Sequence, residues 1–220
     1  VNIVANLWNS PELTPDKTGA PTSGGTEAAL LAGISAWLNW RDRRKRQGND
    51  FSSPNLVASG FHNAAWERFA SLWQIEMRTA PAGFGSPVPD TTAVEGLCDE
   101  NTIMVVATLG SVFTGLNDNT EAIDRAVGEV CKKNGYEIPI HVDAAIGGLV
   151  EPFIRPGNKW DFRLGRVTSI STSAHKYGLV YPSLGWVVWR DGSLLHPSLR
   201  PSGSFPDIAG SFPFLNISRT

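Results

Sequence analysis

Features that would place this chain in a specialised class of protein are scarce. Its 220 residues include only two cysteines, Cys98 and Cys131, which lie far apart and lack the spacing of metal ligands. Positive and negative side chains nearly balance at a net charge of −2, so nothing favours a polyanionic partner such as a nucleic acid. No apolar run approaches the roughly 20 residues of a membrane span, and no signal peptide precedes the first motif. We therefore expect a cytoplasmic protein with reduced thiols, no bound metal and no membrane partner.

Internal repeats and low-complexity tracts are also missing, and no G-x-G-x-x-G pattern follows the first predicted strand. That absence sets aside a nicotinamide-binding domain, although the alternation of strands and helices would suit one. Hydrophobic residues make up 41% of the chain, which is enough for a sizeable core. A chain of this length is expected to form one large domain.

Short apolar runs alternate with segments of helical periodicity. This pattern predicts an α/β fold with a mostly parallel sheet and helices on both faces. The predicted strands are Leu56–Ala58, Ile75–Thr79, Ile103–Thr108, Ile138–Asp143, Val167–Ser171 and Trp186–Trp189. The predicted helices are Thr26–Gln47, His62–Trp73, Thr91–Asp99 and Asn119–Asn134. Residues 1–8 read as part of an amphipathic helix, and residues 197–213, rich in Pro, Gly and Ser, as a long loop.

The longest predicted helix ends in a basic run, Arg41–Arg46, and Gly48 is suited to cap it. Such a run can bind nucleic acid. A solvated helix end whose charge complements the helix dipole is the favoured interpretation, because the total charge is balanced. Trp37 and Trp40 on the same helix are expected to pack in the core or at a dimer interface.

Two chemically active side chains follow strands of the predicted sheet. Asp143 ends one strand, and Lys176 follows His175 shortly after the next. A pyridoxal phosphate (PLP) site needs such a pair, because the lysine attaches the cofactor and the carboxylate keeps its pyridine nitrogen protonated. Burial beside a cationic neighbour lowers the pKa of a lysine and frees its amine to react near neutral pH. Each residue also has an ordinary structural interpretation. A single lysine at a strand end is usually a solvated surface charge, and a single aspartate after a strand is usually a turn residue or a helix cap.

A third segment is suited to bind a phosphate. Gly24-Gly25-Thr26 precedes the longest predicted helix, whose first N–H groups and dipole attract an anion. Read alone, Thr26 before an apolar helix is equally an ordinary N-cap.

Together these segments resemble the large domain of the group II PLP-dependent decarboxylases, and among them the glutamate decarboxylases. The matching blocks, in order, are Thr22–Ala28, His141–Gly148, Trp160–Leu164 with Ser171–Gly178, and Gly185–Arg190. The resemblance implies a fold type I, PLP-dependent transferase-like large domain over residues 1–220. It also implies that the family's N-terminal segment and C-terminal small domain are absent from this chain. The opening at Val1 and the close at Thr220, where the family continues, favour a fragment over a processed or shortened paralogue.

The resemblance implies a catalytic trio of Lys176, His175 and Asp143. Lys176 would hold PLP as a Schiff base, and Asp143 would pair with the ring nitrogen. His175 would donate to the phosphate or work near the reacting carbon.

Further cofactor contacts follow from the same resemblance. Gly25, Thr26 and Ser173 would hold the phosphate, and Ala145 would lie on one face of the ring. Asn63 takes the place where glutamate decarboxylases tend to have the Gln that covers the other face, but His62 lies one residue away, so the choice stays open. Thr108 would lie near the ring hydroxyl and the substrate carboxylate, and Ser218 would reach the phosphate of a partner subunit.

The implied function is decarboxylation of an amino acid, most directly of L-glutamate to 4-aminobutanoate and CO2, by a homodimer or higher homo-oligomer. Two alternatives stay open. One is a group II decarboxylase or sphingosine-phosphate-lyase-like enzyme with another substrate, because Gly25 and Thr26 stand where glutamate decarboxylases often carry two serines. The other is a non-catalytic truncated paralogue that keeps the fold as a binding surface. The resemblance places most of the groups that recognise the glutamate side chain outside this chain.

Overall fold

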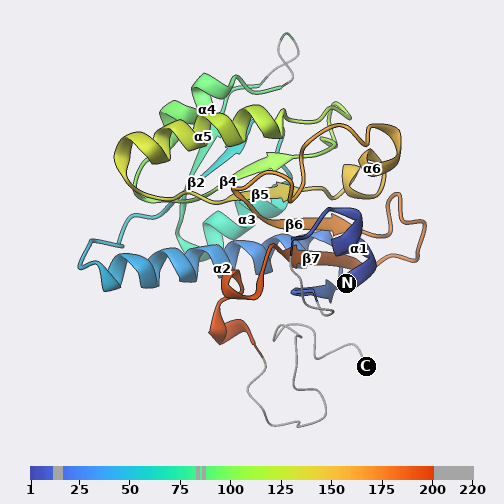
Figure 1. Cartoon of the computed structure of the whole chain (residues 1–220), viewed down its shortest axis with the longest axis horizontal. Coiled ribbons are helices and arrows are strands. Elements are labelled where there is room, and N and C mark those ends of the chain that lie inside the picture. Colours follow the sequence, from blue (N-terminus) through green and yellow to red (C-terminus); the bar gives the residue numbers. More distant parts are fainter. Residues whose placement is uncertain (12–16, 83–84, 86–87, 201–220) are drawn as a thin grey trace.

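A single mixed sheet forms the centre of the molecule (Figure 1). The structure is a computed structural model that describes residues 1–11, 17–82, 85 and 88–200. In the described part of the chain the strand order is β1-β7-β6-β5-β4-β2-β3. The strands are β1 (Gly19–Thr22), β2 (Asn55–Ser59), β3 (Glu76–Ala80), β4 (Thr102–Thr108), β5 (Ile140–Asp143), β6 (Val167–Ser173) and β7 (Gly185–Trp189).

Helices cover both faces of this sheet, as the alternating pattern predicted. Figure 1 shows α4 and α5 on one side and the long α2 on the other. The α-helices are α1 (Asn2–Leu7), α2 (Gly25–Arg46), α3 (Ala64–Trp73), α4 (Thr91–Leu97), α5 (Thr120–Asn134) and α6 (Glu151–Ile154). Three short 3-10 helices are η1 (Gly147–Leu149), η2 (Gly192–Leu194) and η3 (Pro197–Leu199).

Side chains alternate between the two faces of the sheet along each strand, so core residues pack on both faces. On β4, Val105 and Ala107 pack with α5, whereas Met104 and Val106 pack with α2 and α3. All seven residues of β4 are buried, as expected for a strand covered on both faces. The near-continuous apolar run from Ile103 therefore predicted this strand correctly.

Strand direction brings several chain segments to one edge of the sheet. β2, β4, β5 and β6 run parallel to one another, so their carboxyl ends lie at the same edge. β7 is antiparallel to β6, and β1 is antiparallel to β7. β1 therefore runs in the direction of β6, and α2, which follows it, begins at that same edge.

The sequence interpretation missed β1 and was wrong about one loop. β1 contains Pro21 and has no apolar run, but an edge strand tolerates a proline because one side of it needs no partner. The loop predicted over residues 197–213 begins with the 3-10 helix η3, because the His196 side chain accepts a hydrogen bond from the Ser198 N–H and caps that turn. Residues 201–213 lie outside the described part of the chain.

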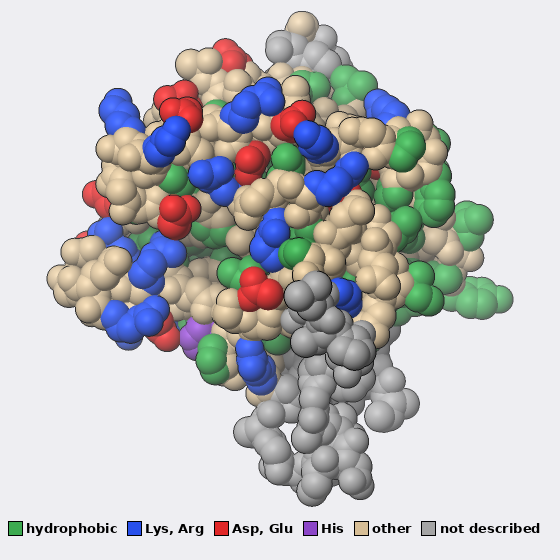
Figure 2. Space-filling view, viewed as in Figure 1, with side chains coloured by type: hydrophobic (Ala, Val, Ile, Leu, Met, Phe, Trp, Pro, Cys, Tyr) green, Lys and Arg blue, Asp and Glu red, His purple; other side chains and the backbone are tan. Residues whose placement is uncertain are grey.

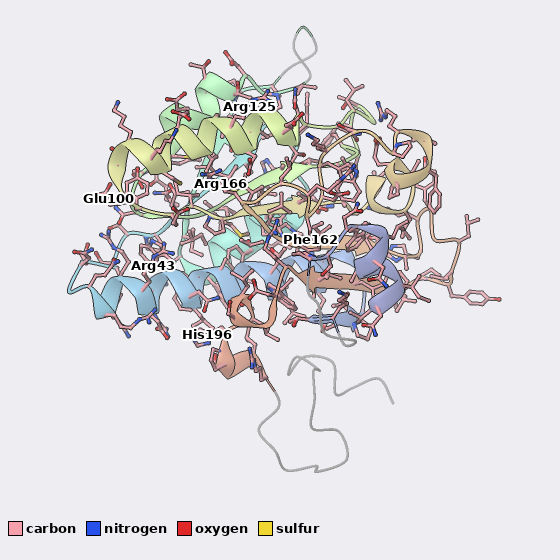
Figure 3. The ribbon with its side chains drawn as sticks, viewed as in Figure 1. Arg43, Glu100, Arg125, Phe162, Arg166 and His196 are labelled. Carbon is pink, nitrogen blue, oxygen red and sulfur yellow. The ribbon has the colours of Figure 1, made fainter. Side chains whose placement is uncertain are left out.

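The basic end of α2 makes contacts within the chain. Arg43, labelled in Figure 3, donates to the backbone oxygen of Glu137, and Arg44 donates to the backbone oxygen of Asp50. The Arg41 guanidinium lies 5.0 Å from the centre of the Trp37 ring. Gly48 follows the helix in the left-handed conformation, with φ 69°. These contacts pair part of the basic run within the chain, and Figure 2 shows acidic and basic side chains mixed over this face.

Three further expectations, on the thiols, on a metal site and on a membrane-spanning helix, can be compared with the described residues. Cys98 and Cys131 are both free thiols, and burial raises the pKa of Cys98 to about 12. Within the described ranges, no cluster of His, Cys, Asp and Glu side chains is arranged to hold a metal ion. The described helices include none with the length and apolar character needed to cross a bilayer.

Candidate active site

A cavity of about 430 Å³ opens at the edge of the sheet where β5, β6 and the start of α2 meet. Eight of the ten predicted site residues line it. They are Gly25, Thr26, Asn63, Asp143, Ala145, Ser173, His175 and Lys176. Predicted residues from four separate stretches of the sequence therefore meet in one cavity.

Asp143 lies at the end of β5 with only 5% of its surface exposed. Each carboxylate oxygen accepts one hydrogen bond. The Ala145 N–H donates to Oδ1 at 3.1 Å, and Nε1 of Trp66 donates to Oδ2 at 2.9 Å. Burial raises the pKa of Asp143, and these two donors together with the charge of Lys176 oppose that rise. The carboxylate is thus held in one orientation inside a nearly dry environment.

Lys176 follows β6 and shares the cavity with Asp143. Burial lowers the pKa of its amine, and the charge of Asp143 opposes that change. A lowered pKa raises the fraction of neutral amine, which is the nucleophilic form. The preceding residue, His175, places Nδ1 3.2 Å from the backbone oxygen of Leu184 and also lines the cavity.

The start of α2 forms another wall of the cavity. Gly24, with φ 134°, is the N-cap residue and supplies no side-chain cap, so the first N–H groups of the helix lack that acceptor. The alternative in which Thr26 is the N-cap is therefore wrong, because α2 begins at Gly25. A methyl group at Gly25 would overlap the Ser173 hydroxyl, so glycine is what leaves space here. Unsatisfied N–H groups beside a hydroxyl are suited to bind a phosphate.

The structure distinguishes between Asn63 and His62, the two side chains that could cover one face of a bound ring. Asn63 lines the cavity and also caps α3, since its Oδ1 accepts from the Ala65 N–H at 2.9 Å. His62 is turned elsewhere, with Nδ1 2.6 Å from the Ser59 backbone oxygen and Nε2 3.3 Å from Glu67. The geometry favours Asn63 as the side chain that borders a bound ring.

Two predicted residues do not line the cavity. Thr108 lies beside Asp143 in the register of β4 and β5, but it is not among the lining residues. Its buried Oγ1 has no hydrogen-bond partner among the described residues. Ser218 lies outside the described part of the chain, so its predicted role stays a prediction.

Sequence reasoning missed other contributors to the site. Ser23, Ala65, Pro182 and Ser183 also line the cavity. Trp66, to which the sequence analysis gave no role, donates directly to Asp143. A tryptophan inside a helix reads as a core residue, and nothing in its local sequence reveals the partner of its N–H group.

Comparison with known proteins is consistent with this geometry. The pyridoxal-dependent decarboxylase conserved domain matches residues 1–203. A glutamate decarboxylase of Lactococcus lactis is 41% identical over 220 residues, which are 99% of this chain and 47% of that protein. The solved structure of Lactobacillus brevis glutamate decarboxylase matches with a TM-score of 0.90 and 40% identity, over 98% of this chain and 48% of that one.

A more distant match is the sphingosine-1-phosphate lyase of Burkholderia pseudomallei, with a TM-score of 0.73 and 26% identity. It covers 88% of this chain and 44% of the lyase. The chain spans less than half the length of these matched relatives. Because the conserved domain covers nearly all the described residues and the expected side chains meet in one cavity, the chain belongs to the pyridoxal-dependent decarboxylase family.

Proposed function

We propose that the protein is a PLP-dependent carboxy-lyase that converts L-glutamate to 4-aminobutanoate and CO2. The observation that carries this proposal is the meeting of Asp143 and Lys176 in one cavity below the start of α2. The substrate follows from 41% identity to a protein named glutamate decarboxylase. We infer the same function for this chain because the similarity extends over 99% of it.

The residues that are present fit PLP. The uncapped start of α2, with Gly25 and the Ser173 hydroxyl, would hold the phosphate, and the helix dipole adds roughly half a positive charge there. Asp143 would pair with the ring nitrogen, and Asn63 and Ala145 would border the ring. Lys176 would hold the aldehyde carbon. When bound, PLP supplies a protonated ring that accepts the electron pair of the bond to the leaving carboxylate.

The chain's own residues prepare this reaction in three ways. Two N–H groups donate to Asp143 and oppose the rise in its pKa that burial causes, so they favour the ionised carboxylate. Burial lowers the pKa of Lys176, which raises the fraction of neutral amine that can attack a carbonyl carbon or accept a proton. His175 lines the cavity next to Lys176 and is placed to hold or move a proton at the reacting carbon.

A second candidate is a lyase with another amino-containing substrate. The match to the sphingosine-1-phosphate lyase supports it, as does Gly25-Thr26 in place of two serines. Incubating the full-length protein and PLP with a panel of amino acids separates the two. The proposal requires that 4-aminobutanoate from glutamate be the main amine product, and a different main product would reject glutamate as the substrate.

The cofactor assignment has its own test. Borohydride reduction of the PLP-loaded full-length protein should fix the label on Lys176, as read by peptide mass spectrometry. A label on another lysine would reject the assignment, and Lys176→Ala should abolish the label.

We also infer that a second copy of the chain packs beside the cavity. Tyr177 and Tyr181 directly adjoin the cavity-lining residues Lys176 and Pro182 in the chain. They belong to a set of exposed apolar side chains, here called the apolar rim: Phe113, Phe153, Ile154, Tyr177, Leu179 and Tyr181. Figure 2 shows hydrophobic side chains at the right margin, where Figure 1 places α6 and the loop between β6 and β7. Tyr181 is 92% exposed, and burying such side chains would favour association. The homo-oligomer, the cytoplasmic location and the assignment of residues 1–220 as the PLP-binding large domain stay predictions.

A further inference from the structure

A buried polar cluster lies behind Asp143, on the side away from the cavity. Trp66 is fully buried and lines no part of the cavity, yet its Nε1 donates to Asp143 Oδ2 at 2.9 Å. An indole N–H is a donor only and does not titrate near neutral pH. It therefore presents Asp143 with a hydrogen-bond donor that stays the same at every working pH.

The position of Trp66 is itself fixed by its neighbours. Its ring meets Phe69 edge to face at 6.2 Å between centres and meets His141 at 4.9 Å. The two ring nitrogens of His141 lie 2.8 Å from Ser169 Oγ and 2.9 Å from Ser171 Oγ. Burial lowers the pKa of His141 to about 3, so this ring is neutral. The cluster thus orients the indole without adding a charge behind Asp143.

The two donors to Asp143 differ in origin. The Ala145 N–H belongs to the turn that follows β5, and Trp66 reaches the carboxylate from α3. Rotation of the carboxylate would break both bonds at once. The titratable groups that also act on Asp143 are Lys176 from the end of β6 and His62 from the segment before α3. Trp66 is therefore the side-chain donor that orients this carboxylate from outside the cavity.

We propose that Trp66 is the positioning residue for Asp143, fixing the carboxylate in the orientation needed to bind a protonated ring nitrogen. This inference rests on the proposed function, because only a cationic partner in the cavity makes that orientation matter. Removing the indole N–H should free the carboxylate to rotate and should raise the pKa of Asp143. Both changes weaken its hold on a protonated ring.

Trp66→Phe in the full-length protein tests the proposal, with Trp40→Phe as the matched control. Trp40 belongs to the same core cluster, is also buried, and donates Nε1 to the backbone oxygen of Glu100 at 3.1 Å. Neither Trp40 nor Glu100, which is labelled in Figure 3, lines the cavity. We expect Trp66→Phe to weaken PLP binding about tenfold or more relative to Trp40→Phe, since a hydrogen bond to a charged group is lost. The pH at which bound PLP loses its ring proton should fall in Trp66→Phe alone, as read by absorbance.

A second variant avoids a change of shape. Replacing Trp66 with 3-benzothienylalanine puts sulfur in place of the N–H group and leaves the packing nearly intact. It should reproduce the loss of PLP affinity and the shift in absorbance. If both variants at position 66 bind PLP as Trp40→Phe does, with the same pH profile, the positioning role is refuted while PLP binding stands.

Failure of the proposed function gives a different result. If the unmodified protein forms no borohydride-fixed bond at Lys176, the PLP proposal falls, and the role of Trp66 in binding PLP falls with it. Titration of Asp143 by carbon-13 NMR in the cofactor-free protein then tests the hydrogen bond alone. An unchanged pKa of Asp143 in the benzothienyl variant would refute the link between the two side chains.

Discussion

Gly25→Ala should separate binding of the cofactor's phosphate from stability of the fold. The new methyl group would lie 3.6 Å from Ser173 Cβ and 3.8 Å from Ala145 Cβ, but it would overlap Ser173 Oγ. The hydroxyl is the mobile atom in this contact, because Ser173 Cβ is fixed at the end of β6. The variant therefore turns the hydroxyl out of the cavity. Losing one hydrogen bond to a charged phosphate costs about 1.5–3 kcal/mol, which is roughly a 10- to 100-fold rise in the Kd for PLP.

The effect of the same change on folding should be small. Alanine gains about 1 kcal/mol over glycine in a helix, and the crowding costs about 1–3 kcal/mol. The free energy of unfolding should then change by no more than about 2 kcal/mol, which urea unfolding of the cofactor-free protein measures.

A double-mutant cycle with Ser173→Ala identifies the cause. If Gly25→Ala acts by displacing the hydroxyl, it should have little further effect on PLP affinity, measured by fluorescence titration, once Ser173 is alanine. Fully additive losses would show that the methyl group blocks the phosphate directly. A wild-type Kd in Gly25→Ala would refute the reasoning that the glycine leaves space for an anion.

Three further predictions concern stability and assembly. Burial raises the pKa of Asp118 to about 6 from an unfolded value near 4, so the folded state binds the extra proton between these values and stability falls as pH rises through that window. Asp118→Asn should remove this fall, as urea unfolding at pH 4.5 and 6.5 would show, and an unchanged slope would contradict the assignment. Gly33→Ala puts a methyl group within 3.0 Å of three Phe69 ring atoms and should destabilise the fold by about 1–3 kcal/mol, whereas Gly96→Ala, with open space around it, should not. Phe153→Lys in the apolar rim, at a side chain that is 70% exposed, should shift sedimentation towards the monomer with little change in Tm.

The elements that local sequence predicted best are those with strong local signals. β4 is an unbroken apolar run buried on both faces, and α5 has helical periodicity, an Asn119 N-cap and a Gly135 C-cap. β1 carries no such signal, because its position depends on pairing with β7, which lies far along the chain. Long-range pairing, not intrinsic preference, makes those four residues a strand.

The residues of the candidate site also fall into two groups, those that the local sequence predicts and those that depend on contacts between distant segments. Asp143 and Lys176 were predictable, because both follow parallel strands and carboxyl ends of parallel strands share an edge. The choice of Asn63 over His62 was not, because it depends on where α3 begins and which side chain caps it. The contact between Trp66 and Asp143 was hidden for the same reason, since it joins residues from different elements across the core.

The distribution of charge in the cavity argues for the kind of molecule that fits it. The uncapped start of α2 and the Ser173 hydroxyl favour an anion. The oriented, buried carboxylate of Asp143 favours a cation or a protonated nitrogen. Lys176 lines the same cavity, and its lowered pKa favours reaction with an electrophilic carbon. A simple phosphate ester satisfies only the first of these three features, and a free amino acid lacks the electrophile. A pyridine aldehyde that carries a phosphate satisfies all three, so PLP fits the cavity on electrostatic grounds that are independent of sequence similarity.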